Sequence, residues 1–199
     1  MKSHHSSSPL ATRHTPLISK EPHWYEQSHL LRTRVPADRL VWLLDTESLT
    51  HRVRQACGGR FRVRVLSQGW GRPLRSEARV LQLRGGERCL VREVQLLCDE
   101  RPWVFARTII PATTLSGPQL RLARLGSRPL GAVLFADPSM RRGAVQIAAI
   151  TDRHGMFARA TRELKQRPAQ IWGRRSVFRV GDKPLLVSEI FLPGLGKCV

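Results

Sequence analysis

Two charged residues, Arg92 and Glu189, stand at positions where strand periodicity places apolar side chains. An inward guanidinium is suited to binding a carboxylate, and an inward carboxylate is suited to accepting a proton. Burying an unpaired charge is costly, so each group needs the other, a polar network or a ligand. A structural ion pair and a ligand site both remain open. Because successive strand side chains point to opposite faces, Arg92 aligns with Leu90, Val94, Leu96 and Cys98, and Glu189 aligns with Leu185, Val187 and Phe191.

The elements that must position these two residues are β-strands. Residues 60–66, 76–83, 89–98 and 103–110 all have strand character, and reversals are expected at 85–86 and 99–102. These runs predict an antiparallel meander that carries Arg92. The segment 172–192 predicts a hairpin that turns at Gly181-Asp182 and carries Glu189 on its returning arm.

Short helices are expected around this sheet. One covers residues 37–44, and Ser48 is expected to cap a second, with Leu49, Val53 and Cys57 on one face. Ser116 is a plausible cap for a helix through Leu122. A further strand is expected over 143–151 and a further helix over 155–165. The glycines of 125–131 permit close backbone approach to a bound molecule, although a plain turn explains them equally well.

Length and composition predict one globular domain. The chain has 199 residues, of which 41% are hydrophobic, and residues 1–22 lack an apolar period. We therefore expect a disordered, dispensable tail over 1–22 and a folded domain over 23–199. No apolar run spans a bilayer or resembles a secretory signal, which favours a cytoplasmic protein without membrane insertion. The cysteines show no Cys-x-x-Cys spacing, so neither a metal site nor a disulfide framework is expected.

The net charge of +19 is the usual footprint of a nucleic-acid-binding protein. The distribution of the charge argues against that class. Five of the 34 basic residues are lysines, and the other 29 are arginines scattered along the whole chain without a basic block. Trp172-Gly173-Arg174-Arg175 is more typical of ordinary packing than of a phosphate site. Phosphate-binding glycine loops and the serine-hydrolase elbow are absent from the sequence.

An ordered set of sequence segments stands out between about residues 40 and 193. The segments are Leu90-Val91-Arg92-Glu93-Val94, Ala106-Arg107-Thr108-Ile109-Ile110-Pro111, Thr114-Leu115-Ser116-Gly117-Pro118, Pro129-Leu130-Gly131, Trp172-Gly173-Arg174-Arg175-Ser176 and Lys183-Pro184-Leu185-Leu186-Val187-Ser188-Glu189-Ile190-Phe191-Leu192-Pro193. Together they resemble the bacterial chorismate lyase family. The resemblance implies an α+β fold, with a single antiparallel sheet of about six strands flanked by helices and an enclosed ligand pocket. It also implies conversion of chorismate to 4-hydroxybenzoate and pyruvate, the first committed step toward ubiquinone, without metal or cofactor.

The resemblance also assigns residues to the site. The family's ligand-contacting arginine falls on Arg92, its acidic residue on Glu189, its backbone contact on Leu130, and a flap methionine on Leu49, a departure that keeps the apolar character. Arg92 is implied to hold a substrate carboxylate, and Glu189 to act either as a base or as an acceptor for the ring hydroxyl. The region 152–170 is longer than in the shortest members and is expected to add a helix.

The expected partners are the small molecules chorismate and 4-hydroxybenzoate, bound by a monomer without nucleic acid. The main alternative is a non-catalytic effector-binding domain of the same fold, as occurs in transcription regulators. Such regulators carry a DNA-reading helix-turn-helix domain ahead of the effector domain. The first 36 residues here are too short and irregular to form one.

Overall fold

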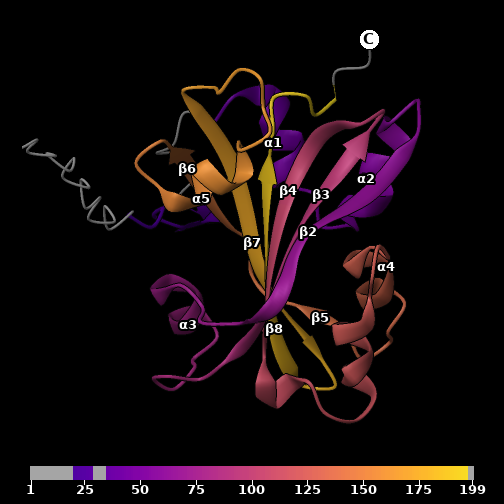
Figure 1. The fold of residues 1–199 in the computed structure, drawn as a ribbon, viewed down its shortest axis with the longest axis vertical. Coiled ribbons are helices and arrows are strands. Elements are labelled where there is room, and N and C mark those ends of the chain that lie inside the picture. Colours follow the sequence, from indigo (N-terminus) through magenta and orange to yellow (C-terminus); the bar gives the residue numbers. More distant parts are fainter. Residues whose placement is uncertain (1–19, 29–34, 197–199) are drawn as a thin grey trace, which may run out of the picture.

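The computed structural model describes residues 20–28 and 35–196. One antiparallel sheet runs through the molecule, with its strands in the order β1-β6-β7-β8-β4-β3-β2 and with β5 paired to β7 (Figure 1). Six strands are long, and β1 and β5 have two residues each, so the sheet has eight strands rather than the expected six. The strands are β1 (Tyr25–Glu26), β2 (Phe61–Gly71), β3 (Cys89–Cys98), β4 (Arg101–Pro111), β5 (Arg141–Arg142), β6 (Gln146–Thr151), β7 (Gln170–Val180) and β8 (Lys183–Phe191).

Two tight turns fix the register of the central strands. Asp99 and Glu100 join β3 to β4 with φ values of 46° and 62°, and Gly181 and Asp182 join β7 to β8 with φ values of 53° and 63°. Two consecutive left-handed residues give the type I′ geometry that matches strand twist. The predicted turn at Gly181-Asp182 is confirmed. The β7–β8 hairpin then pairs through β8 with β4, so Glu189 lies opposite Ala106.

The prediction of a strand over 76–83 is wrong, because this segment contains helix α3 (Arg75–Val80). Side-chain carboxylates satisfy the first N–H groups of this helix. Glu77 accepts a hydrogen bond from the Leu74 N–H at 2.7 Å, and Glu21 accepts bonds from the N–H groups of Arg75 and Ser76, both at 2.8 Å. Two of these three hydrogen bonds therefore come from a segment more than 50 residues earlier, which local pattern does not reveal.

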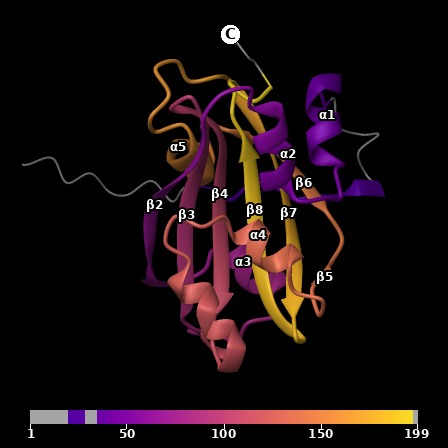
Figure 2. The ribbon, with the colours of Figure 1, turned by 90° about the vertical axis from the view of Figure 1, so that its right-hand side faces the viewer.

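Helices cover both faces of the sheet (Figures 1 and 2). Helices α1 (Ala37–Leu43), α2 (Leu49–Ala56) and α4 (Leu130–Phe135) lie on one face, whereas α3 and α5 (Gly155–Ala160) lie on the other. The expected cap of α2 is confirmed, since Ser48 accepts a hydrogen bond from the His51 N–H. The expected helix after Ser116 forms as a 3₁₀ helix, η3 (Gly117–Arg124), without a side-chain cap, and a short 3₁₀ turn, η2 (Ala112–Thr114), precedes it.

A disulfide joins Cys57, at the end of α2, to Cys98, at the end of β3. This corrects the expectation that the cysteines form no disulfide. The two residues are 41 positions apart and form no local motif, but β2–β3 pairing brings their Cα atoms to 5.7 Å. The bond ties the C-terminal end of α2 to the sheet. Cys89 is a buried free thiol, and burial raises its pKa to about 11.

The structure describes the last three residues of the expected N-terminal tail. Residues 1–19 of the expected tail lie outside the described residues. Residues 20–22, which the sequence assigns to the same tail, make defined contacts: Lys20 bridges to His154, and Glu21 caps α3. Within residues 20–28 and 35–196, no helix is long and apolar enough to cross a membrane.

Candidate functional site

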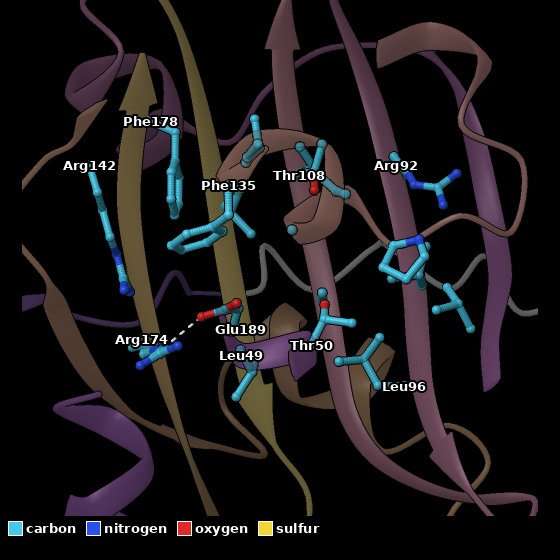
Figure 3. Close-up of a pocket in the computed structure, with 18 of the residues that line it drawn as sticks. Leu49, Thr50, Arg92, Leu96, Thr108, Phe135, Arg142, Arg174, Phe178 and Glu189 are labelled. Atoms are coloured by element: carbon cyan, nitrogen blue, oxygen red, sulfur yellow. Dashed lines mark hydrogen bonds and ion pairs between the residues drawn. The ribbon is translucent and has the colours of Figure 1, made fainter. Parts of the chain in front are cut away.

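A pocket lies between the sheet and the helices α2 and α4. Its floor comes from β3, β4, β7 and β8, and most of its wall is apolar, including Leu49, Leu96, Leu134, Phe135 and Phe178 (Figure 3). The four residues that the sequence assigns to the site, Leu49, Arg92, Leu130 and Glu189, all line this one cavity. Strand alternation therefore points both charges inward, as expected.

Arg92 is buried without an acidic partner. Its side chain is on the pocket face of β3, and the residue is 2% exposed. Nη1 donates to Oε1 of Gln68 at 2.8 Å, and Nη2 donates to the carbonyl of Gly126 at 2.7 Å. Burial lowers the pKa of the guanidinium, and no carboxylate of the described residues lies within 4.0 Å of it. Two neutral oxygens thus orient a charge that no carboxylate among residues 20–28 and 35–196 balances.

Glu189 pairs with a different arginine. Its Oε2 accepts a hydrogen bond from Nε of Arg174 at 2.6 Å, and the Glu189 side chain is 16% exposed. Arg174 is 1% exposed and also donates from Nη1 to the carbonyls of Trp42 and Asp45, at 2.8 and 2.5 Å. No described residue forms a hydrogen bond with Oε1 of Glu189. The carboxylate is therefore held at one oxygen and available at the other.

The alternative of a structural ion pair between Arg92 and Glu189 is wrong. One strand, β4, separates them: Arg92 pairs with Thr108 and Glu189 pairs with Ala106. Two strand spacings place their backbones about 10 Å apart across the sheet, with a further offset of about 7 Å along it. This separation leaves room for a six-membered ring between a group at Arg92 and a group at Glu189.

Helix α4 closes the pocket next to α2. Leu130 is its first residue, so the Leu130 N–H belongs to the first turn, whose N–H groups have no partner within the helix. A Cβ at Gly131 would lie 3.2 Å from Oγ1 of Thr50 and 3.3 Å from Oγ of Ser48. Glycine therefore permits the close approach of the two helices. The glycine-containing segment 125–131 also supplies the Gly126 carbonyl that orients Arg92.

Two further arginines of the pocket, Arg142 and Arg174, were missed as site residues by sequence reasoning. Arg174 lies on the same face of its strand as Trp172, Ser176 and Phe178. Strand periodicity could therefore have identified it as an inward charge. Arg142 offered no such signal, because β5 is only two residues long. With Arg92, these residues place three guanidinium groups around the cavity, against the carboxylates of Glu189 and the exposed Glu47. The pocket is therefore net cationic and suited to an anion.

The sheet and pocket together define a class of small α+β domain with a cationic pocket. Similar folds occur in effector domains of transcription regulators. The chain resembles the effector domain of PhnF from Mycobacterium smegmatis with a TM-score of 0.57 and 17% identity, over 75% of this chain and 90% of that one. A GntR-family regulator from Bacillus cereus gives a TM-score of 0.51 and 10% identity, over 70% and 96% of the two chains. At such identities the likeness concerns the fold alone.

Sequence relatives identify the family. A probable chorismate pyruvate-lyase from Methylococcus capsulatus is 46% identical over 154 residues, which is 77% of this chain and 94% of the relative. A probable chorismate pyruvate-lyase from Azoarcus sp. is 46% identical over 175 residues, covering 85% and 92%. The family model for chorismate lyase matches residues 21–196. The chain belongs to the chorismate lyase family.

Proposed function

We propose that this protein converts chorismate to 4-hydroxybenzoate and pyruvate. The observation that carries the proposal is the match to the family model over residues 21–196. The cationic pocket is lined by residues within this matched range. Chorismate is a dianion with a ring carboxylate and an enolpyruvyl carboxylate. Its charge and its ring suit a pocket with an apolar wall and inward arginines. Supply of the product to ubiquinone biosynthesis remains a prediction.

Arg92 is proposed to bind the ring carboxylate. A planar guanidinium matches a planar carboxylate, and the unbalanced charge of Arg92 is the strongest reason to place an anion there. The N–H of Leu130, at the start of α4, is proposed to donate to the same carboxylate. The side chain of Leu49, on α2, is proposed to contact the face of the ring that points away from the sheet. These contacts fix the ring so that its far edge faces Glu189.

The chemistry is an elimination that forms an aromatic ring. The C4–H bond and the bond from C3 to the ether oxygen break, and the electron pair of the C–H bond completes the ring. Enolpyruvate leaves and takes up a proton to become pyruvate. The free Oε1 of Glu189 is proposed to lie at C4, where it removes the proton or accepts a hydrogen bond from the C4 hydroxyl. Arg174 holds the other oxygen and so fixes the carboxylate.

The test is direct. Purified protein is incubated with chorismate, and 4-hydroxybenzoate is followed by absorbance, with the Arg92→Ala variant as the control for spontaneous decay. We expect turnover by the parent only. The described residues contain no cluster of three or more His, Cys, Asp or Glu side chains that could hold a metal ion, so we also expect activity to survive EDTA. Loss of turnover after chelation, restored by one divalent ion, would contradict the prediction of a cofactor-free reaction.

The alternative is a ligand-binding domain without chemistry, a role that this pocket could also serve because a cationic cavity can bind an anion without converting it. Such a domain binds 4-hydroxybenzoate or a related anion but leaves chorismate intact. Binding of 4-hydroxybenzoate without any conversion of chorismate would therefore favour this second function.

A further inference from the structure

The end of the pocket away from Arg92 carries a second arginine without an acidic partner, Arg142 (Figure 3). Arg142 lies on β5 and extends toward Arg174 and Glu189, whereas Arg92 lies on the opposite side of the cavity. No carboxylate of the described residues is within 4.0 Å of its guanidinium nitrogens. Arg174, by contrast, is paired with Glu189. The pocket therefore offers two unbalanced guanidinium groups, one at each end.

Neutral groups hold Arg142 in place. Nε donates to Oγ of Ser176 at 3.2 Å, and Nη1 donates to the carbonyls of Asp45 and Thr46 at 3.3 and 3.1 Å. The guanidinium carbon lies 5.4 Å from the centre of the Phe178 ring. No described residue accepts a hydrogen bond from Nη2. Three hydrogen bonds and the Phe178 ring thus orient the side chain and leave donor capacity for a ligand.

Burial and the neighbouring Arg174 make this position unfavourable for a cation. Burial lowers the pKa of Arg142, and the positive charge of Arg174 lowers it further, against opposing effects of Glu189 and Asp45. The Asp45 carboxylate is engaged elsewhere, because it accepts a hydrogen bond from Arg52 at 2.8 Å. A bound anion would supply the missing negative charge.

We propose that Arg142 binds the enolpyruvyl carboxylate of chorismate and assists departure of enolpyruvate. This inference rests on the proposed function. With the ring carboxylate at Arg92 and C4 at Glu189, the ether substituent on C3, the neighbour of C4, is placed next to Glu189, and Arg142 extends toward Glu189 (Figure 3). As the ether bond breaks, negative charge develops on the leaving oxygen, and a fixed guanidinium stabilises it. Arg142 is thus a substrate contact that the product lacks.

Because the product lacks the enolpyruvyl carboxylate, the role of Arg142 can be tested by comparing chorismate with 4-hydroxybenzoate. Chorismate carries both carboxylates, whereas 4-hydroxybenzoate keeps only the one assigned to Arg92. Arg142→Gln should therefore lower kcat/KM for chorismate by at least about 30-fold and leave the Kd of 4-hydroxybenzoate within about threefold of the parent. Arg92→Ala should weaken both ligands. The matched control is Arg141→Gln, which removes the exposed neighbouring arginine and should change neither quantity.

Two added measurements keep the test decisive. Arg142→Lys keeps the charge and should recover only part of kcat/KM, and thermal unfolding of each variant identifies any that fails to fold. Inhibitor pairs give a readout without turnover. The parent should bind 3-(carboxymethoxy)benzoate more tightly than benzoate, because only the diacid reaches both arginines, and Arg142→Gln should abolish that preference.

The outcomes separate the two proposals. Equal losses for chorismate and 4-hydroxybenzoate in a folded Arg142→Gln variant would overturn the role of Arg142, and so would unchanged kcat/KM. A parent that prefers the diacid through Arg142 but leaves chorismate intact would support the second carboxylate site and contradict the proposed reaction. A parent that shows neither turnover nor diacid preference would overturn both.

Discussion

Arg92 and Arg107 lie on neighbouring strands, β3 and β4, but point to opposite faces of the sheet. Both are buried, at 2% and 3% exposure. On the α3 face, Arg107 donates to Glu77 and to Glu93, each at 2.8 Å. Burial alone would lower the pKa of Arg107, but these two carboxylates outweigh it and raise the pKa. On the α4 face, Arg92 meets only neutral oxygens, and its pKa is lowered.

The comparison separates a structural charge from a candidate binding charge. The protein itself neutralises Arg107, so that cluster needs no ligand. Arg92 keeps an unbalanced charge and lies beside a cavity. The lack of a carboxylate partner does not by itself indicate a binding site. Arg175 also has no carboxylate partner among the described residues, but it bonds to Gln146 and Ser76 and packs against the Trp24 ring at 4.6 Å. Burial lowers its pKa to about 10.

Removal of Arg107 should give the largest effect on stability. Arg107→Ala leaves Glu77, which is 1% exposed, without its arginine partner, whereas Glu93 keeps Arg159 at 2.9 Å. We expect a loss of about 3–5 kcal/mol in the free energy of unfolding, because isolated buried charge is costly. Urea unfolding measures it. A loss below about 1 kcal/mol would break the comparison by showing that the cluster is not structural.

Arg92→Ala should show the opposite pattern. Its removal leaves no carboxylate orphaned, so unfolding should change far less than in Arg107→Ala. Affinity for 4-hydroxybenzoate should fall by roughly 100-fold or more, since the ring carboxylate loses its partner. Arg92→Lys should recover little, because it keeps the charge and loses the planar fork. Titration of each variant with 4-hydroxybenzoate measures this affinity. Binding of 4-hydroxybenzoate as tight as in the parent would show that Arg92 does not bind the carboxylate.

Glu189→Gln sharpens the division of roles inside the pocket. The change keeps size and one oxygen but removes the basic carboxylate. We expect turnover of chorismate to fall by roughly 100-fold, with a smaller effect on the Kd of 4-hydroxybenzoate. Steady-state rates and product titration are compared on the same preparation. Full turnover in the variant would leave Glu189 as only the partner of Arg174.

The disulfide provides a test of the lid on the pocket face. Cys57→Ser removes the link between α2 and β3, and we expect a loss of about 2–4 kcal/mol in the free energy of unfolding. Because Leu49 and Thr50 of α2 line the pocket, affinity for 4-hydroxybenzoate should also fall. Cys89→Ser is the control for loss of a buried thiol. If reduction by dithiothreitol leaves the unfolding midpoint unchanged, the bond does not stabilise the domain.

Truncation of the N-terminus should give the smallest effect. A chain that begins at Glu21 is expected to fold and turn over as the parent does, because it keeps the carboxylate that caps α3. A chain that begins at Trp24 loses that carboxylate and should be less stable by about 1 kcal/mol. Thermal unfolding and turnover of the two chains are measured together. A large loss in the chain that begins at Glu21 would contradict the dispensable tail.

Local pattern was sufficient for β3, β4 and the β7–β8 hairpin and for the direction of the two charges, but β2 continues to Gly71, beyond the expected 60–66. Alternation along β3 and β8 depends only on backbone geometry, so Arg92 and Glu189 were placed inward before any contact was known. The Gly181-Asp182 turn and the Ser48 cap are equally local. The family resemblance, carried by ordered segments, added Leu49 and Leu130 to the same cavity.

Only the tertiary structure decided which charges meet. Glu21 from the N-terminal segment caps α3, where the sequence predicted a strand, and Cys57 reaches Cys98 through strand pairing. Whether Arg92 pairs with Glu189 depends on the strand between them, and Arg174 occupies the position beside Glu189 instead. Periodicity fixes the face to which a side chain points. The partner it finds there comes from residues distant in the chain, and their positions follow from the sheet order and helix packing.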